Sequence, residues 1–300
     1  MPAPTHFLTG AELDENRLDL LLREAAALKE KPRSARGLDG RTVALLFQQP
    51  STRTRVSFET GVYELGGHPM VLRGPELQLT RGESIRDTAL VLSRHVAAIG
   101  LRTADEDELA TLAEHASVPV FNMLSPLHHP CQALADLQTL REAYGSLEGR
   151  VLAYVGDGNN VARSLAVVGA KAGLEVRVAA PDGYQLAPGE TEAVLTDDPA
   201  EAVDGADAVY TDVWVSMSDD ADSAAARREA LAPYRLDAAL LDKAAPGAFA
   251  LHCLPAHPGE EITEDVLYGD RQRIWDQAEN RRHAQKALLE LLVSPSAADG

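Results

Sequence analysis

The stretch VALLFQQPSTRTR, residues 43–55, decides the fold class. Its first five residues are apolar, and a short apolar run bounded by polar residues predicts a buried strand. After a polar turn, the hydroxyl-rich segment 51–54 opens a predicted helix that ends near Gly66 and Gly67. A buried strand that passes through a short turn into a helix is the repeating unit of a parallel sheet with helices on both faces.

The same alternation continues along the chain. A Thr9–Glu12 capping-box pattern precedes a helix with Leu18, Leu21, Leu22, Ala25 and Leu28 at helical spacing. Further strands are predicted at 70–72, 97–101, 118–123, 151–155, 176–180, 208–211 and 249–251. Further helices are predicted at 85–96, 105–115, 133–144, 160–172, 223–231 and 279–292, the segment 133–144 bridging the two halves. We therefore expect an α/β protein with two doubly wound parallel-sheet domains.

Length and composition agree with two globular domains. The chain has 300 residues, of which 45 % are hydrophobic, and a domain usually takes about 100–200 residues. No apolar run reaches the roughly 18 residues of a membrane span, and no secretory signal is visible at the N-terminus. Two cysteines, Cys131 and Cys253, make no disulfide framework, so we expect a cytoplasmic protein.

The net charge narrows the class of ligand. With 28 basic and 46 acidic residues the formal net charge is −18. Such a chain repels polyanions, so neither nucleic acid nor an anionic membrane surface is an expected partner. A phosphate could be held only by a local cluster of arginines and backbone N–H groups.

Segment 50–55, Pro-Ser-Thr-Arg-Thr-Arg, is the best candidate for such a cluster. It opens a helix, and a helix N-terminus presents unpaired N–H groups and the positive end of the dipole. No Walker lysine and no run of glycines follows, which excludes a nucleotide P-loop. The alternative is an ordinary helix cap with two surface arginines.

Segment 128–133, His-His-Pro-Cys-Gln-Ala, follows the fourth predicted strand. Ligands bind at the carboxyl ends of parallel strands, where His129 and Gln132 could donate to a carbonyl or phosphate. A structural zinc site takes four ligands and a catalytic one three. The sequence offers no matching ligand pair, so no metal is expected.

Segment 155–161, Val-Gly-Asp-Gly-Asn-Asn-Val, partly matches a dinucleotide fingerprint. Strand, glycine turn and helix are present, but Val161 occupies the position of the third glycine. The other interpretation is that Asn159 and Asn160 offer their amides to a small zwitterion.

Two further positions have two interpretations each, and a third has one. Asp212 follows a strand and could hold an ammonium group or only cap a turn. Cys253 follows a strand and could be a nucleophile or a buried small residue. Arg281 lies in the last predicted helix, where a lone arginine is usually a surface group.

Taken together, these segments resemble the aspartate/ornithine carbamoyltransferase family over about residues 8–292. Segments 51–55 and 129–132 resemble the carbamoyl-phosphate segments that the family shares. Segments 212–217 and 252–255 resemble those of the ornithine-using members, because aspartate-using members carry Pro-Leu in place of Cys253 and Leu254.

The resemblance implies the site. Residues expected to bind carbamoyl phosphate are Ser51, Thr52, Arg53, Thr54, Gln78, Arg102, His129, Gln132, Cys253, Leu254 and Arg281. Catalytic roles are expected for Arg102, His129, Cys253 and Arg281. Residues expected to bind the amino-acid end of ornithine are Asn160, Asp212, Ser216 and Met217. Arg55 belongs to the motif but is expected to support the fold.

The resemblance also implies a reaction and an organisation. Carbamoyl phosphate and L-ornithine would give L-citrulline and phosphate without cofactor or metal. Residues 1–134 and a C-terminal helix at about 279–293, which returns to the first domain, would hold carbamoyl phosphate. Residues 135–278 would hold ornithine. Trimers or multiples of trimers are expected, with Gln78 entering a neighbour's site. Ser218 and Pro258 depart from the family pattern in loops.

Three alternatives remain open. A carbamoyltransferase for putrescine or an acylated ornithine is the nearest, although Asp212 favours an acceptor with a free ammonium group. An NAD-dependent dehydrogenase would use the glycine turn at Gly156. A non-catalytic anion-binding protein is the third, although ligand-type residues are intact across all six segments.

Overall fold

The computed structural model describes residues 5–215 and 221–293. Within these ranges the chain forms two compact units. The first unit extends to Gln138 and resumes at Glu279, and the second unit is Thr139–Ala278. Two helices, α5 (Pro130–Tyr144) and α11 (Ile274–Val293), run through these division points.

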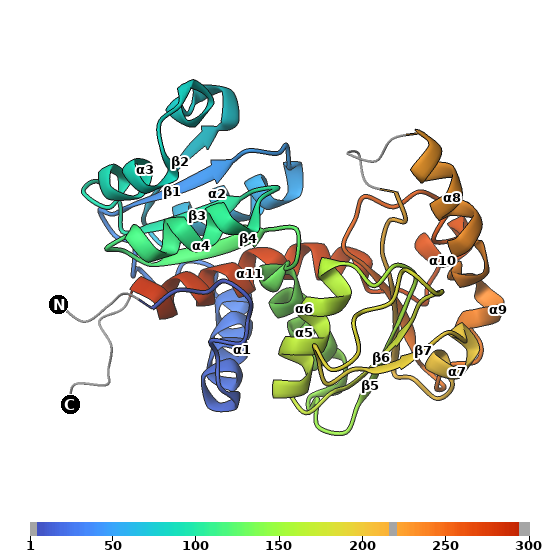
Figure 1. Cartoon of the computed structure of the whole chain (residues 1–300). Coiled ribbons are helices and arrows are strands. Elements are labelled where there is room, and N and C mark those ends of the chain that lie inside the picture. Colours follow the sequence, from blue (N-terminus) through green and yellow to red (C-terminus); the bar gives the residue numbers. More distant parts are fainter. Residues whose placement is uncertain (1–4, 216–220, 294–300) are drawn as a thin grey trace. The chain divides into compact units, whose positions relative to one another are not determined.

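The first unit contains a four-stranded parallel sheet in the order β2-β1-β3-β4 (Figure 1). Its strands are β1 (Thr42–Phe47), β2 (His68–Arg73), β3 (Ala98–Arg102) and β4 (Val120–Leu124). Its helices are α1 (Glu15–Glu30), α2 (Thr52–Glu64), α3 (Ile85–Leu92) and α4 (Glu106–His115), with 3-10 turns η1 (Gly74–Glu76) and η2 (Gln78–Arg81).

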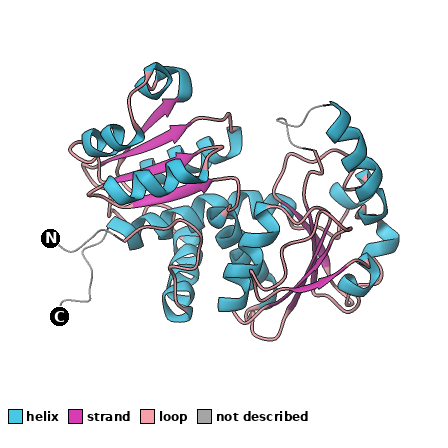
Figure 2. Ribbon diagram, viewed as in Figure 1, coloured by secondary structure: helices cyan, strands magenta, loops and turns pink. Residues whose placement is uncertain are grey.

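Strand β1 is buried on both faces, as its unbroken apolar run predicts. On one face Ala44 and Leu46 pack with residues of α3 and α4. On the other face α2 places Phe58 against Phe121 of β4, with ring centroids 5.0 Å apart. Figure 2 shows the strands of this sheet with helices beside them. Helices therefore cover both faces of the sheet. Polar side chains that contact a bound molecule must lie in the loops at the ends of the strands.

Helix boundaries follow local chemistry. Helix α2 ends at Glu64, and Gly66 adopts φ +84°, a left-handed conformation that favours glycine and stops the helix as predicted. The buried face of α1 consists of the five apolar residues that the spacing predicts. The Thr9–Glu12 prediction was wrong, because Glu12 closes a separate turn and α1 starts at Glu15 with Asp14 as its cap.

The second unit contains a five-stranded parallel sheet in the order β7-β6-β5-β8-β9. Its strands are β5 (Val151–Val155), β6 (Glu175–Ala179), β7 (Val194–Thr196), β8 (Ala208–Thr211) and β9 (Phe249–His252). Its helices are α6 (Asn160–Lys171), α7 (Pro199–Val203), α8 (Ala221–Leu231), α9 (Ala238–Leu241) and α10 (Glu264–Leu267), with the 3-10 turn η3 (Ala232–Tyr234).

In both sheets all strands are parallel, but the order in which they are added reverses at the first strand. In the first sheet β1 lies between β2 and β3, and in the second β5 lies between β6 and β8. The loops after two such strands leave toward opposite faces, and the crevice between them is where open α/β sheets bind ligands. The topology thus marks the loops after β1 and β3 in one unit, and those after β5 and β8 in the other.

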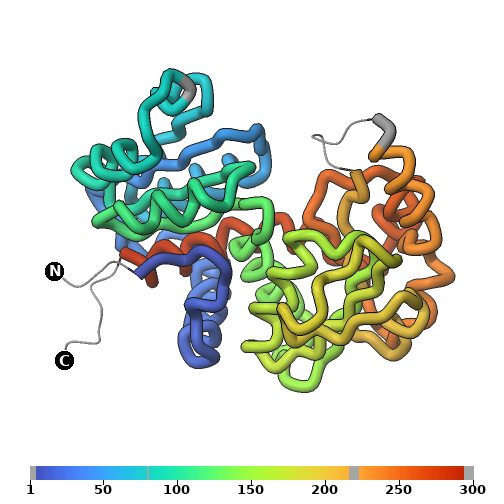
Figure 3. The backbone as a smooth tube through the Cα atoms, in the orientation of Figure 1, coloured from blue at the N-terminus to red at the C-terminus, as the bar shows by residue number. Residues whose placement is uncertain are grey.

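Helix α11 begins at Ile274, earlier than the predicted start near Glu279. From Glu279 onward it packs within the first unit beside α1, although the two helices lie at opposite ends of the sequence (Figure 3). Lys29 of α1 donates to the Asn280 side chain at 2.8 Å. The predicted strands and helices are otherwise confirmed within a few residues, and β7 and the short helices α7, α9 and α10 were not predicted.

Candidate active site

In the first unit, the turn after β1 leads into the N-terminus of α2. Ser51 caps this helix, and its Oγ accepts a hydrogen bond from the Thr54 backbone N–H at 3.3 Å. Helical N–H groups and the hydroxyls of the predicted segment therefore occupy the loop that the strand order marks for ligands. Arg55 forms an ion pair with Glu59 at 2.8 Å, one turn further along α2.

A chain of buried hydrogen bonds links three distant segments of the first unit. The Arg281 guanidinium donates to Thr54 Oγ1 at 2.6 Å and to Gln132 Oε1 at 2.8 Å. Gln132 in turn donates to Asp136 Oδ1 at 2.7 Å. Arg281 is 3 % exposed, so it is a buried group and not the surface arginine that its sequence context first suggests.

His129 lies buried within the field of three arginines. Burial lowers the pKa of His129 well below its ordinary value, and the positive charges of Arg281, Arg102 and Arg53 lower it further. The imidazole is therefore neutral at pH 7, and it offers one donor and one acceptor nitrogen. These arginines concentrate positive charge in a chain whose net charge is −18.

Three more residues of the first unit are Gln78 and Thr52, both predicted to bind carbamoyl phosphate, and Cys131, which belongs to the segment 128–133 but has no predicted role. Gln78 is exposed at the start of η2. Thr52 is the first, exposed residue of α2. Cys131 is fully buried, and its Sγ donates to the Asn122 carbonyl oxygen at 3.1 Å. Burial raises the pKa of the Cys131 thiol to about 12, so this cysteine is an inert core residue.

In the second unit, the predicted Asp212 and Cys253 come together. Asp212 follows β8 and is 5 % exposed, and Cys253 follows the neighbouring strand β9. Cys253 Sγ donates to Asp212 Oδ1 at 2.9 Å. Asn159, from the turn after β5, donates through Nδ2 to Asp212 Oδ2 at 3.0 Å. The loops at the sheet's reversal point thus converge on one carboxylate.

The Cys253–Leu254 segment is held by buried groups behind it. His252 Nδ1 accepts from the Leu254 N–H at 2.8 Å, and Nε2 faces Glu261 Oε1 at 3.2 Å. Glu261 and His252 are both buried, and hydrogen bonds from His252 and from the His257 backbone N–H lower the pKa of Glu261 against the effect of burial. Leu254 itself has φ +62°, a conformation that a branched side chain rarely adopts.

Sequence reasoning missed the supporting carboxylates Asp136 and Glu261. Asp136 lies one helical turn after Gln132, and this i, i+4 spacing on a predicted helix could have suggested it. Glu261 follows His252 across an irregular loop, and no local pattern points to their contact. Ser216 and Met217, predicted to bind ornithine, lie outside the described residues, as does Ser218.

Asp212, His252 and Cys253 offer ligand atoms within 4.8 Å of one another, which raises the question of a metal. His252 cannot serve, because its Nδ1 accepts from Leu254 N–H and its Nε2 therefore carries the proton that faces Glu261. Two remaining ligands do not make a zinc site.

The glycine turn after β5 does not suit a dinucleotide. Gly156 adopts φ +133°, so the tight turn needs its glycine. A Cβ on Gly158 would lie 2.6 Å from the Tyr184 carbonyl oxygen and 2.7 Å from the Leu186 nitrogen. The side of Gly158 on which a pyrophosphate would approach is thus filled by the chain's own backbone.

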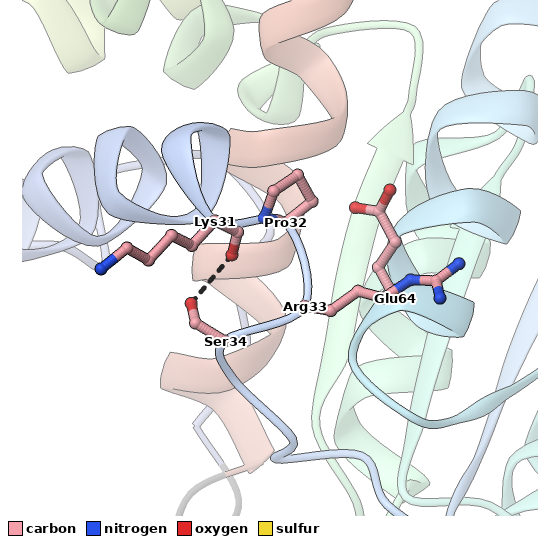
Figure 4. Close-up of a pocket in the computed structure, with 5 residues that line it drawn as sticks. All are labelled: Lys31, Pro32, Arg33, Ser34 and Glu64. Carbon is pink, nitrogen blue, oxygen red and sulfur yellow. Dashed lines mark hydrogen bonds between the residues drawn. The ribbon is translucent and has the colours of Figure 1, made fainter.

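A cavity of about 620 Å³ lies elsewhere in the first unit and contains none of these residues. Figure 4 shows its lining side chains, Lys31, Pro32, Arg33, Ser34 and Glu64. Their polar groups have structural partners: Ser34 donates to the Lys31 carbonyl, Arg33 stacks over Tyr63, and Glu64 pairs with Lys286. We assign no function to this cavity.

Comparison with known proteins identifies the family to which this chain belongs. A sequence model described as the aspartate/ornithine carbamoyltransferase carbamoyl-P binding domain matches residues 5–142. A second, described as the Asp/Orn binding domain of the same family, matches residues 148–292. The chain belongs to the aspartate/ornithine carbamoyltransferase family. The resemblance noted from the sequence motifs is thereby confirmed.

Relatives in the carbamoyltransferase family cover the whole chain. An ornithine carbamoyltransferase from Acidothermus cellulolyticus is 53 % identical, over 98 % of either chain. The solved ornithine carbamoyltransferase from Pyrococcus furiosus is 44 % identical, covers 97 % of both chains and superposes with a TM-score of 0.92. A solved N-acetyl-L-ornithine transcarbamylase is 28 % identical, covers 96 % of this chain and 99 % of its own, and has a TM-score of 0.84. The predicted fold, two parallel-sheet α/β domains, is confirmed.

A helix that spans a membrane needs about 20 predominantly apolar residues. None of the helices within residues 5–215 and 221–293 combines the length and the apolar character needed.

Proposed function

We propose that this chain transfers the carbamoyl group of carbamoyl phosphate to the δ-amine of L-ornithine, producing L-citrulline and phosphate. The observation that carries the proposal is the pairing of Cys253 with Asp212 in the Asp/Orn-binding half of a carbamoyltransferase. Cys253 belongs to the His-Cys-Leu-Pro segment that resembles the ornithine-using branch. The named ornithine carbamoyltransferases among its relatives support the same substrate.

Carbamoyl phosphate is assigned to the first unit. The phosphate would be held by Ser51, Thr52, Arg53 and Thr54, with helix α2 directing its N-terminus at the anion. Arg102, His129, Gln132 and Arg281 would bind the carbonyl and bridging oxygens. Gln78 is assigned to the site of a neighbouring subunit in a homotrimer, a role consistent with its exposure on η2.

Ornithine is assigned to the second unit. Asp212 would pair with the α-ammonium group, with Asn160, Ser216 and Met217 around the amino-acid end. Cys253 and Leu254 would contact the δ-amine and the carbamoyl group. An acylated ornithine lacks the ammonium that Asp212 would bind, and putrescine lacks the α-carboxylate as well.

The chemistry follows from these assignments. The neutral δ-amine attacks the carbamoyl carbon, a C–N bond forms, and the bond from that carbon to the phosphate oxygen breaks. Negative charge grows on the carbonyl oxygen and on the leaving phosphate, where the buried Arg281 and the half-buried Arg53 and Arg102 would stabilise it better than water. The proton released by the attacking nitrogen leaves with the phosphate. Carbamoyl phosphate is already activated, so these steps need no cofactor and no metal. We also propose a cytoplasmic location.

An assay of phosphate release from carbamoyl phosphate, run with four acceptors, tests the proposal, because each acceptor gives a different carbamoylated product and only ornithine gives citrulline. L-ornithine, N-acetyl-L-ornithine, putrescine and L-aspartate are supplied at equal concentration with carbamoyl phosphate. We expect kcat/KM for ornithine to exceed that for each of the other three by at least about 100-fold, the value of about 2.7 kcal/mol of lost charge-assisted contact. Turnover of another acceptor at an equal or higher rate would refute the assignment.

A further inference from the structure

Asn159 occupies the turn between β5 and α6 and uses every polar atom of its side chain. Its Oδ1 accepts from the backbone N–H groups of Val161 at 2.9 Å and Ala162 at 3.2 Å, which makes it the N-cap of α6. The buried Tyr154 hydroxyl also donates to Oδ1, at 3.2 Å. Since three donors surround this oxygen, the orientation of the amide is determined, and Nδ2 must face the other way.

The atom that Nδ2 faces is Asp212 Oδ2, at 3.0 Å. The other carboxylate oxygen of Asp212, Oδ1, receives the Cys253 thiol at 2.9 Å. Each oxygen of a carboxylate has two lone-pair directions. With one direction on each oxygen taken, the plane of the carboxylate is fixed and the remaining directions are available to a cation.

The turn that carries Asn159 is itself rigid. Gly158 donates to the Tyr184 carbonyl at 2.7 Å, and its Cα has no room for a side chain. Asp157 forms an ion pair with Arg227, whose guanidinium stacks on the Tyr184 ring at 5.0 Å. The turn that carries Asn159 is therefore held on both sides of Gly158, and its amide faces Asp212 from this fixed backbone.

We propose that Asn159 is a positioning residue for Asp212, holding that carboxylate in the orientation that receives the ammonium group of the amino-acid acceptor. The inference rests on the proposed function. It assigns to Asn159 two separable tasks, the capping of α6 through Oδ1 and the orientation of Asp212 through Nδ2.

Substitution by aspartate separates these tasks. Aspartate caps helices as well as asparagine does, so Asn159→Asp keeps the acceptors for Val161 and Ala162. It replaces the donor by an acceptor and puts two carboxylates about 3 Å apart, which like charges disfavour. Asn159→Ser is the second variant: it also caps, carries no like charge and is too short to reach Asp212 in the same way.

The experiment measures melting temperature, kcat, and the KM of each substrate for the wild type and both variants. We expect Asn159→Asp to raise the KM for ornithine by about 10- to 100-fold, the range of one charge-assisted hydrogen bond. Asn159→Ser should raise it less, and the KM for carbamoyl phosphate should stay within about twofold in both. The control is Asp237→Asn at the N-cap of α9, which makes the opposite exchange at a cap outside the site and should leave both KM values unchanged.

Two results would overturn the inference. If Asn159→Asp and Asn159→Ser both keep the wild-type KM for ornithine, Asn159 only caps α6, while the proposed function stands. If the wild type forms no citrulline from ornithine, the proposed function is wrong, and the inference about Asn159 is wrong as well.

Discussion

At the scale of single residues, the first unit concentrates positive charge around a neutral histidine. Burial lowers the pKa of His129 most, and the positive charges of Arg281, Arg102 and Arg53 lower it further, so the imidazole stays uncharged. Arginine offers a planar fork of donors that matches the oxygens of a phosphate. A site of this composition is suited to an anion although the protein carries a net charge of −18, and this supports the proposed carbamoyl-phosphate site.

Arg53→Ala should weaken carbamoyl-phosphate binding and leave the fold intact. The side chain is half-buried at the start of α2 and belongs to the predicted phosphate segment, so its loss removes charge where the phosphate would sit. We expect a rise in the KM for carbamoyl phosphate of about 10- to 100-fold, from the loss of one charged contact. The control is Arg36→Ala, which removes an exposed arginine paired with Asp39. Unchanged KM and kcat in Arg53→Ala would contradict the assignment.

Asp212→Asn tests the ornithine end of the site. Neutralising the carboxylate removes the partner proposed for the α-ammonium group, at a cost of roughly 1.5–3 kcal/mol. The KM for ornithine should rise by about 10- to 150-fold, and that for carbamoyl phosphate should change little. Steady-state kinetics and a thermal melt separate the two roles considered for Asp212. A lowered melting temperature with a normal KM for ornithine would show that the residue only supports the turn.

At the scale of elements, α11 carries buried charged groups into the core of the first unit. Lys286 is fully buried and pairs with Glu64 of α2 at 2.6 Å. Its ammonium also donates to the carbonyl oxygens of Leu28 and Pro32, which fastens α11 to the end of α1. The same helix places Arg281 on Thr54, so its attachment also orients a candidate catalytic group.

Lys286→Met should destabilise the protein by about 3–5 kcal/mol, the usual cost of leaving one buried charge without its partner. Urea unfolding of the single variant and of the double variant Glu64→Leu, Lys286→Met gives the comparison. The double variant should recover much of the loss, because no uncompensated carboxylate remains. A loss below about 0.5 kcal/mol in the single variant would mean that Glu64 is adequately paired by Arg282, 3.5 Å away.

At the scale of the whole molecule, buried histidines make stability depend on pH. Burial lowers the pKa of His283 to about 4, with Lys286 and Arg282 adding to the effect and Glu279 opposing it. The pKa of His129 is lowered as well. In the unfolded chain both histidines take up protons near pH 6.5, whereas the folded protein binds them only at lower pH.

The melting temperature should therefore be level above pH 6.5 and fall as the pH drops from 6.5 toward 4. Below pH 6.5 the unfolded state binds more protons than the folded state, so the free energy of unfolding becomes smaller as the pH falls. His283→Gln should flatten this slope, whatever it does to stability at pH 8. Thermal melts of both proteins between pH 8 and 5 give the two slopes. Parallel curves would show that His283 does not titrate as described.

The sequence by itself determined the class of fold and most of its elements. The apolar run 43–47 and the helical spacing of apolar residues in α1 are local patterns. Each predicts which side chains of its own element are buried. Local patterns failed at element ends and edges. The edge strand β7 is short and partly exposed. At the start of α11 the Gln272 side chain accepts from the Ile274 N–H, and glutamine is not among the usual N-cap residues.

Only the tertiary structure decided which side chains meet. Thr54 and Arg281 are 227 residues apart in sequence, and Asp212 lies 53 residues from Asn159 and 41 from Cys253. Strand order brings such residues together, because the loops at a reversal point of a parallel sheet converge whatever their separation along the chain. The motifs predicted candidate ligands one segment at a time. The amide of Asn159 and the thiol of Cys253 can both contact the Asp212 carboxylate only when β5, β8 and β9 lie side by side.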